Sequence, residues 1–160
     1  TQTLKGAEVG GFPAGTWASG GDLNTGRDNL IGMGLNTAGL VTGGEAASVR
    51  LAVTESYNGT SWTAGGNYVT SNRILSGAGT QTAALGFGGI DPVGATGTTA
   101  LYDGSSWTTS PASLSIGRYY ATGVGTQTAA LCAGGAGMPQ TNATEEFTGA
   151  FLSTKTLTTS

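Results

Sequence analysis

The sequence predicts an all-β protein built from consecutive repeats of about 45 residues, each folded as a four-stranded antiparallel sheet. Residues 79–85, with the sequence GTQTAAL, return unchanged as residues 125–131, and an altered copy, GLNTAGL, occupies residues 34–40. Tryptophans recur at intervals of 45 residues, as Trp17, Trp62 and Trp107. A repeat of this length identifies the structural unit. Within each unit the side chains alternate with a period of two, which is typical of short strands.

Each repeat contains the same four landmarks in the same order: an arginine, a Gly-Gly pair, an aromatic residue and a tryptophan. These landmarks are Arg27, Gly43-Gly44, Tyr57 and Trp62, then Arg73, Gly88-Gly89, Tyr102 and Trp107, then Arg118, Gly134-Gly135 and Phe147. Phe12 and Trp17 match the last two landmarks of a preceding repeat. We therefore expect one repeat domain over residues 1–160, with a partial leading unit (1–26) and three full units (27–66, 67–111 and 112–160).

The first two strands of each repeat are expected around the GTQTAAL motif. Residues 83–87 are apolar throughout, so this strand has no polar face and should be covered on both sides by neighbouring sheets. Glycines stand two residues apart just before this strand in every repeat, as Gly32 and Gly34, Gly77 and Gly79, and Gly123 and Gly125. Glycine weakens a strand by roughly 0.5–1 kcal/mol relative to alanine. Their repetition therefore predicts that another backbone approaches closely, as where strands crowd around an axis.

The last two strands are expected on either side of a tight turn. Residues 49–57 alternate between apolar and polar side chains and predict the third strand, although the glycine-free run 45–58 leaves a helix as an alternative. Asn58-Gly59 and Asp103-Gly104 then favour hairpin turns, because both positions tolerate positive φ. The fourth strand carries the tryptophan.

Two connections vary between the repeats, one after the Gly-Gly pair and one after the tryptophan. In a four-stranded antiparallel unit these connections lie at the same end. Variable loops on a rigid scaffold carry specificity, so we expect any binding function at that end.

The landmarks together resemble the kelch repeat, in which each unit forms one blade of a β-propeller. The resemblance covers residues 27–147 and implies kelch-like blades, three full ones after a partial N-terminal one. Two features depart from the pattern. Only four residues separate the aromatic residue from the tryptophan, fewer than in most kelch repeats, and Leu152 stands where the spacing places a fourth tryptophan.

The repeats are also similar to those of phage-encoded propeller proteins associated with the virion, notably of marine phages. The segments TESYNGTSW (54–62) and GTQTAAL carry this similarity. It implies a location in the virion or, more generally, outside the cell. A secreted assembly remains open as a second setting.

Three blades and a partial one are too few for a ring, since propellers close with about four to eight blades. A blade without a neighbour leaves apolar side chains in water, at a cost on the order of 4–6 kcal/mol for one tryptophan. We expect the ring to be completed by self-association into a homo-oligomer, by neighbouring virion subunits, or by a missing portion of chain.

The composition disfavours most enzyme classes. The chain has no histidine, which excludes Ser-His-Asp and Cys-His nucleophile arrangements and imidazole metal sites. None of its nine acidic residues forms a pair set apart from the repeat, as a glycosidase needs. A net charge of −3 with six Lys plus Arg gives no basic stripe for nucleic acid, and no apolar run is long enough to insert into a membrane. We expect no enzyme, no cofactor and no metal.

Six residues are candidates for a ligand-binding face. The arginines could hold carboxylates or sugar hydroxyls through two parallel hydrogen bonds, or they could tie each blade to the next. The two tryptophans could stack on sugars or pack between blades. Asp91 lies in a variable connection. The candidates are Arg27, Arg73, Arg118, Asp91, Trp62 and Trp107.

These observations predict a non-enzymatic structural or adhesion module of a virion or secreted assembly. The alternative from another class is a carbohydrate-binding lectin that uses the variable loop face. Protein partners are expected in the first case, and a surface glycan in the second.

Overall fold

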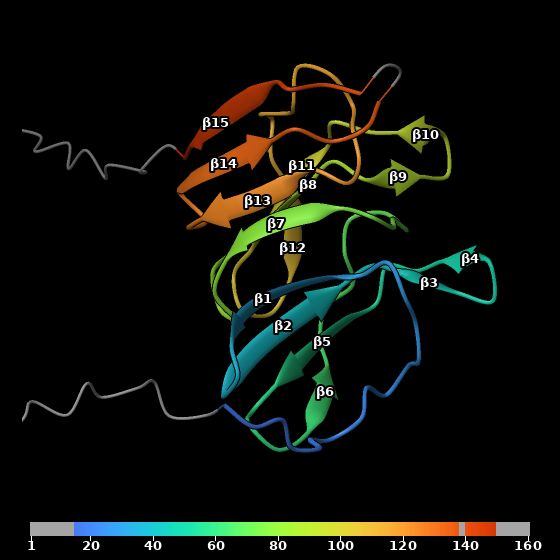
Figure 1. Ribbon diagram of the computed structural model, residues 1–160, viewed down its shortest axis with the longest axis vertical. Coiled ribbons are helices and arrows are strands. Elements are labelled where there is room, and N and C mark those ends of the chain that lie inside the picture. The colour runs from blue at the N-terminus through green and yellow to red at the C-terminus, as the bar shows by residue number, and fades with distance from the viewer. Residues whose placement is uncertain (1–14, 138–139, 150–160) are drawn as a thin grey trace, which may run out of the picture.

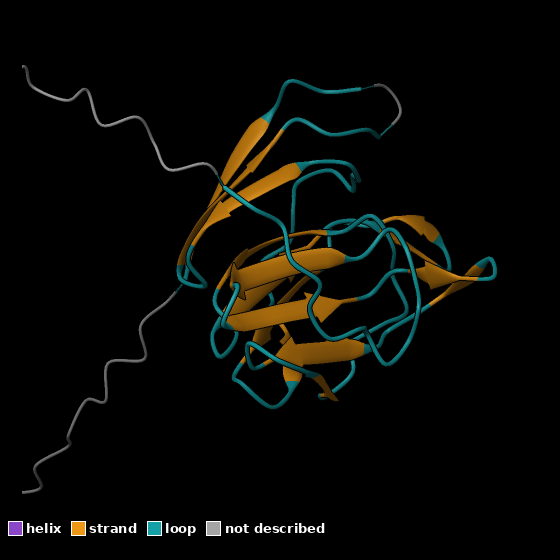
Figure 2. Cartoon of the chain, turned by 60° about the horizontal axis from the view of Figure 1, so that its bottom comes forward, coloured by secondary structure: helices purple, strands orange, loops and turns teal. Residues whose placement is uncertain are grey.

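The computed structural model describes residues 15–137 and 140–149, which form strands and connections without a helix (Figures 1 and 2). Sheet 1 contains β1 (Ile31–Leu35), β2 (Ala38–Thr42), β5 (Thr54–Tyr57) and β6 (Trp62–Ala64). Sheet 2 contains β7 (Ser76–Gly79), β8 (Ala84–Phe87), β11 (Thr99–Tyr102) and β12 (Trp107–Thr109). Sheet 3 contains β13 (Thr122–Gly125), β14 (Ala129–Ala133) and β15 (Thr144–Thr148). The all-β prediction is confirmed.

The three sheets are antiparallel, and their strands pair in chain order. Sheets 1 and 2 each have the four strands that the repeat predicts, and sheet 3 has three within the described residues. The described sheets do not close into a barrel. The expectations for Phe12, for the leading repeat before residue 15 and for Leu152 lie outside the described residues.

Hairpin turns form between the last two strands at the predicted places, but only the glycine of each dipeptide adopts positive φ. Asn58 Oδ1 accepts hydrogen bonds from the backbone N–H groups two and three residues ahead, both at 2.9 Å. Asp103 Oδ1 accepts the equivalent bonds at 2.9 and 2.8 Å, and these bonds hold the pKa of Asp103 well below its usual range. The following glycines, Gly59 and Gly104, have φ of 93° and 97°. Each turn is thus closed by its own side chain.

Two small hairpins occupy the variable connection after the Gly-Gly pair. They are β3 (Glu45–Ala46) with β4 (Val49–Arg50), and β9 (Ile90–Asp91) with β10 (Gly94–Ala95), and both project from the same side of the molecule (Figure 1). The first turns through Ala47 and Ser48, which have φ of 48° and 66°. The helix alternative for residues 45–58 is therefore wrong. The third strand starts at Thr54 because residues 45–50 pair with themselves.

The first strands of the sheets, β1, β7 and β13, lie side by side (Figure 1). A Cβ atom on Gly123 would lie 2.8 Å from the backbone nitrogen of Gly77 and 2.9 Å from the ring of Phe87. A Cβ atom on Gly77 would lie 2.8 Å from the sulfur of Met33. The predicted close approach of another sheet's backbone is confirmed at Gly123, whereas Gly77 faces a side chain and Gly32 has no neighbour closer than 3.8 Å.

The second glycine of each pair has a different role from the one predicted. Gly34, Gly79 and Gly125 have φ of 93°, 108° and 115°, a region that residues with a Cβ atom rarely adopt. They begin the turns into β2, β8 and β14. The local backbone conformation, rather than a neighbouring sheet, therefore requires glycine at these positions.

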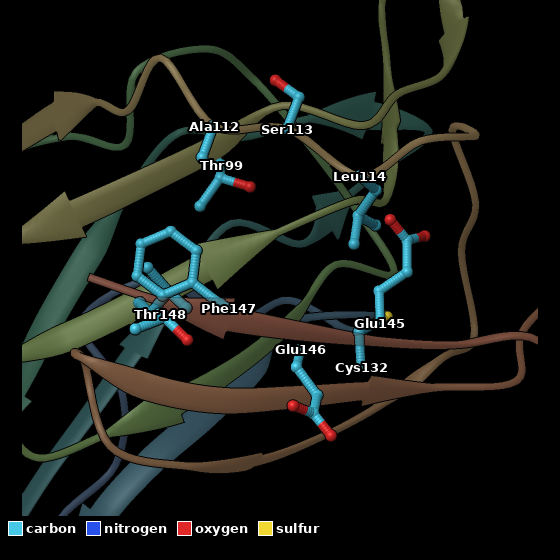
Figure 3. Close-up of a pocket in the computed structure, with 10 residues that line it drawn as sticks. Thr99, Ala112, Ser113, Leu114, Cys132, Glu145, Glu146, Phe147 and Thr148 are labelled. Carbon is cyan, nitrogen blue, oxygen red and sulfur yellow. The ribbon is translucent and has the colours of Figure 1, made fainter. Parts of the chain in front are cut away.

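The core lies between the sheets, and β8 contributes to both of its parts. Ala84 packs in a cluster with Leu40 of sheet 1, whereas Leu85 and Phe87 pack in a second cluster with Ala130 of sheet 3. The prediction that this strand is covered on both sides is confirmed. The second cluster also contains Cys132, and several residues of the same interface are drawn in Figure 3.

The close approach at Gly123 predicts a large difference between two equivalent glycines. Gly123→Val is expected to lower the free energy of unfolding by about 1–3 kcal/mol, because the side chain would overlap the β7 backbone. Gly32→Val is the matched control, since the nearest atom to its Cβ position is a Val41 carbon at 3.8 Å. Urea unfolding measures both variants. Equal losses in the two would contradict the packing of β13 on β7.

Candidate functional site

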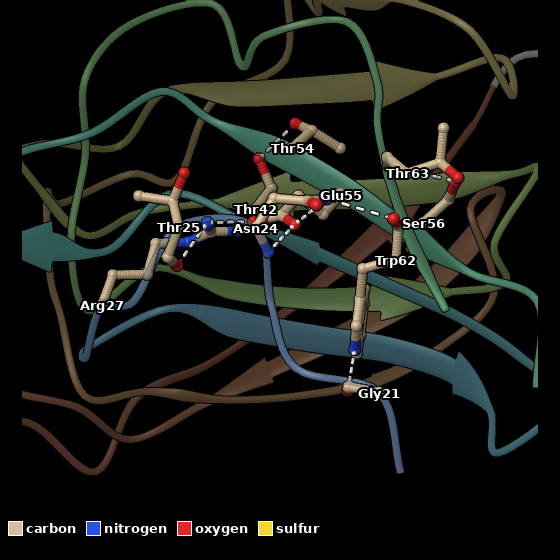
Figure 4. A network of polar contacts seen from close by, with 10 residues as sticks. All are labelled: Gly21, Asn24, Thr25, Arg27, Thr42, Thr54, Glu55, Ser56, Trp62 and Thr63. Atoms are coloured by element: carbon tan, nitrogen blue, oxygen red, sulfur yellow. Dashed lines mark hydrogen bonds and ion pairs between the residues drawn. The ribbon is translucent and has the colours of Figure 1, made fainter. Parts of the chain in front are cut away.

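Arg27 is fully buried in an ion pair with Glu55 of β5 (Figure 4). Its Nη1 group donates to Glu55 Oε1 and, at 3.2 Å, to the carbonyl oxygen of Thr25. The other carboxylate oxygen of Glu55 accepts from the backbone N–H and the side-chain amide of Asn24, at 2.7 and 2.8 Å. This arginine is therefore held inside the protein and does not present its guanidinium group to solvent.

Arg118 repeats this arrangement in sheet 3. Its Nη2 group lies 2.8 Å from Glu145 Oε1, and Nε lies 3.4 Å from the sulfur of Cys132. The second oxygen of Glu145 accepts from the backbone N–H of Ser115 at 2.8 Å. The side chain of Arg118 is 1% exposed. Both arginines thus tie the segment that enters a sheet to the third strand of that sheet.

In sheet 2 an uncharged residue takes the place of the buried arginine. The isolated bridges Asp28–Glu45, Arg73–Ile90 and Tyr119–Ala136 occupy the same place in successive repeats, so Arg73 aligns with Asp28. The residue that aligns with Arg27 and Arg118 is accordingly Asn72, which is buried and donates to the carbonyl oxygen of Gly88 at 2.9 Å. The alignment of Arg73 with the other two arginines is shifted by one residue.

The carboxylate is missing from sheet 2 as well. Glu55 pairs with Val41 across the strands of sheet 1, and the equivalent pair in sheet 2 is Ala100 with Gly86. Both members of the ion pair are therefore replaced together, which keeps an unpaired charge out of the interior. Arg73 instead contacts Glu45 of the projecting hairpin at 3.1 Å and is partly exposed. Of the three arginines, Arg73 is the one that reaches the surface.

The two tryptophans pack against tyrosines of their own sheets. Trp107 is 8% exposed, lies 4.9 Å from the rings of Tyr102 and Tyr68, and donates its N–H to Thr54 Oγ1 of sheet 1 at 3.0 Å. Trp62 is half-buried, lies 4.9 Å from Tyr57, and donates to the carbonyl oxygen of Gly21 at 3.1 Å. The packing interpretation thus describes Trp107, whereas Trp62 is half-buried and Trp17 is fully exposed.

Asp91 stabilises its own hairpin. Its Oδ1 atom accepts from the backbone N–H groups of Val93 and Gly94, at 2.9 and 3.1 Å. Val93 at the tip is 96% exposed, and Val49 of the other hairpin is 60% exposed. The projecting end therefore presents apolar side chains rather than a set of converging polar groups.

The connection after the tryptophan is not a free loop. Gly66 donates to the carbonyl oxygen of Ser105, and Tyr68 donates to that of Ala52, at 3.2 and 2.7 Å. The segment runs between sheets 1 and 2, and Tyr68 is buried there. Burial raises the pKa of its hydroxyl group well above the usual range. Of the two variable connections, only the one that follows the Gly-Gly pair projects as a surface feature.

The residues that recur most faithfully form links between sheets. Gln81 Nε2 donates to the carbonyl oxygens of Gly39 and Tyr57 in sheet 1, at 3.0 and 2.7 Å. Gln127 makes the same two bonds to Ala84 and Tyr102 in sheet 2. Sequence reasoning assigned no role to these glutamines. The exact repetition of GTQTAAL was the signal that could have identified them.

The Gly-Gly pairs link in the opposite direction along the chain. Gly44 donates its backbone N–H to the carbonyl oxygen of Asn72, and Gly89 donates to that of Arg118, both at 2.8 Å. The first glycine of each pair also faces the carbonyl group of that same entering residue. Sheets 1 and 2 are thus bonded to the next sheet by their glycine pairs, and sheets 2 and 3 are bonded to the previous sheet by their glutamines.

The six candidate residues do not form one ligand-binding face. Arg27, Arg118 and Trp107 are interior, and the others lie on different elements. Within residues 15–137 and 140–149 there is no helix of the length and apolarity that a membrane crossing requires. No protein-family model matches this chain, and a search of curated proteins finds no significant match. The kelch-like and phage resemblances remain predictions.

Sheet 2 has Asn72 and Ala100 where sheet 1 has Arg27 and Glu55, and this difference predicts how mutations of the ion pair change the stability of sheet 1. Glu55→Ala should lower the free energy of unfolding by about 3–5 kcal/mol, because it leaves the Arg27 charge buried and unpaired. Arg27→Asn combined with Glu55→Ala copies the solution of sheet 2 and should recover a large part of that loss. Urea unfolding of the two single variants and the double variant measures the coupling. Additive effects would show that the pair does not act as a unit.

The ion pair also predicts a pH dependence. Burial raises the pKa of Glu55, but the hydrogen bonds from Arg27 and Asn24 outweigh burial and lower it below the ordinary value of 4.5. The stabilisation is therefore present above about pH 4.5 and is lost as the pH falls through the folded-state pKa. Between about pH 6 and about pH 3, the wild type should lose more unfolding free energy than Glu55→Gln. Glu146→Gln, which removes an exposed carboxylate, is the control and should resemble the wild type.

Proposed function

We propose that this chain is a non-enzymatic structural or adhesion module of a virion or secreted assembly, in which the sheets act as kelch-like propeller blades. The observation that carries the proposal is the use of the repeated residues. Gln81 and Gln127 bond to the preceding sheet, and the Gly-Gly pairs bond to the following one. Residues that recur for this purpose serve a stacked architecture rather than a reaction.

The outer face of sheet 3 supports completion of the ring by further blades. Val124 of β13 is 52% exposed, whereas the equivalent residue of sheet 2, Ala78, is 5% exposed because sheet 3 covers it. The carbonyl groups equivalent to those that Gln127 bonds are those of Ala130 and Phe147. Within the described residues, no sheet follows to bond them. This face therefore has the form of an interface without its partner.

The opposite face, on sheet 1, has no glutamine to donate hydrogen bonds to a preceding sheet. The residue aligned with Gln81 and Gln127 is Asn36, which is exposed and shorter by one methylene group. Leu35 beside it is 71% exposed. Self-association, neighbouring virion subunits or additional chain could each cover these two faces.

Self-association is the version that a single experiment can test. Native mass spectrometry of the chain is expected to show at least two copies, and Val124→Asp is expected to shift the mass towards one copy. Val93→Asp is the matched control, because Val93 is also an exposed valine, at 96% against 52% for Val124, but lies on a hairpin tip. A monomeric wild type would contradict self-association. Dissociation by the control variant would contradict the choice of face.

The lectin alternative has less support from the geometry. Trp107 is buried and its N–H is bonded to Thr54, so it has no face for a sugar. Trp62 is half-buried beside Tyr57. A glycan array separates the two hypotheses: binding that disappears in Trp62→Ala would favour the lectin, and an array without hits would favour the structural module.

A further inference from the structure

The turn that joins β5 to β6 contains the dipeptide Asn58-Gly59 (Figure 1). Both residues and the following Thr60 are exposed. An asparagine followed by glycine can react within its own chain, because the glycine nitrogen approaches the side-chain amide carbon without hindrance from a Cβ atom. The exposed turn also gives water access to both reacting groups.

The turn polarises the amide group that would react. Asn58 Oδ1 accepts hydrogen bonds from the backbone N–H groups of Thr60 and Ser61, both at 2.9 Å. Negative charge develops on this oxygen when a nucleophile adds to the amide carbon, and N–H groups aimed at such an oxygen lower the barrier. Gly59 has a φ of 93°, which residues with a Cβ atom rarely adopt. The turn therefore requires glycine at the position where the attacking nitrogen must be unhindered.

We propose that Asn58 is a site of spontaneous deamidation. The backbone nitrogen of Gly59 loses its proton to solvent and bonds to Cγ of Asn58, the Cγ–Nδ2 bond breaks, and the side-chain nitrogen takes a proton from solvent and leaves as ammonia. Water then opens the cyclic succinimide. Cleavage of the new bond between Cγ and the glycine nitrogen gives aspartate, and cleavage of the original peptide bond gives isoaspartate. This inference is independent of the proposed structural role.

Sheet 2 already contains the turn that the aspartate product would form. Asp103 is the equivalent residue, and its Oδ1 atom accepts the two equivalent backbone bonds at 2.9 and 2.8 Å. Its carboxylate also accepts from the hydroxyl groups of Ser105 and Ser106, at 2.9 and 3.1 Å. Thr60 and Ser61 carry hydroxyl groups at the same positions of sheet 1. Conversion to aspartate therefore keeps the turn and adds one negative charge.

Isoaspartate fits this turn less well, because it adds a methylene group to the backbone where the chain is closely packed. The segment that enters sheet 1 lies against the turn: a Cβ atom on Gly21 would be 3.3 Å from Cα of Ser61. The carbonyl oxygen of Gly21 also accepts the N–H of Trp62, at 3.1 Å. A longer backbone at residue 58 would disturb these contacts, so we expect the isoaspartate form to be the less stable product.

The equivalent dipeptide of sheet 2 provides an internal comparison. Hydrogen bonds from the backbone N–H groups of Ser106 and Ser105 hold the pKa of Asp103 well below its usual range, so this side chain is an ionised carboxylate at neutral pH. A carboxylate carbon resists attack by a nucleophile. Asp103-Gly104 should therefore keep its normal peptide bond while Asn58 reacts.

Incubation of the full chain at mildly alkaline pH, with peptide mapping by mass spectrometry at intervals, measures the reaction. Asn58 is expected to convert about tenfold faster than Asn36 and Asn142, which are also exposed but are followed by threonine and alanine. Equal rates at the three asparagines would overturn the proposal. Asn58→Gln keeps an amide group but would have to form a larger ring, so it should stop conversion at this position.

Asp103→Asn tests the contribution of the turn itself. It places a second Asn-Gly dipeptide in a turn with the same backbone bonds, and position 103 should then convert at a rate similar to that of Asn58. Lack of conversion there would contradict the role of the turn. Asn58→Asp, which copies the aspartate product, should unfold in urea at the same concentration as the wild type or a higher one. A lower concentration would show that the product does not keep the turn.

Discussion

The structure depends on one constraint, namely that the second strand of a repeat has no polar face. In β8, Ala84 packs towards sheet 1 while Leu85 and Phe87 pack towards sheet 3, so the strand is stable only with a sheet on each side. Face-to-face stacking follows from this requirement. The inter-sheet bonds of Gln81 and Gln127 and the inward glycines at 77 and 123 then fix the distance and register of the stack.

The parts of the fold that the sequence predicts are those with local causes. The turns at Asn58 and Asp103 are closed by side chains within three residues, and the strand at 84–87 is marked by its own composition. The hairpin at 45–50 was not predicted, because Ala47 and Ser48 adopt positive φ without being typical residues for it. Its pairing is decided by backbone bonds of Glu45 to Asp28 rather than by a turn motif.

The candidate site was harder to predict, because its chemistry depends on residues distant in sequence. Gln81 bonds to carbonyl groups 24 and 42 residues away, which no local pattern reveals. The sequence alignment of the repeats was wrong by one residue at this point. It matched Arg73 to Arg27 and Arg118, whereas the matching residue is the adjacent Asn72. Ala100 occupies in sheet 2 the position that Glu55 has in sheet 1, and this loss of a carboxylate indicates that the aligned residue of sheet 2 is not a buried arginine. Reading the Arg27–Glu55 and Arg118–Glu145 pairs together would have identified the correct alignment.

The two kinds of inter-sheet bond have a consequence for any larger assembly. The glycine pair of a sheet donates a backbone hydrogen bond to the following sheet, and its glutamine donates hydrogen bonds to the preceding one. The two faces of a sheet are therefore chemically unlike. Copies joined as the sheets within one chain are joined would therefore add head to tail, with an unlike face on each side of every contact. Such growth ends in a closed ring when the rotation per sheet divides a full turn, and it continues as an open helical filament when it does not.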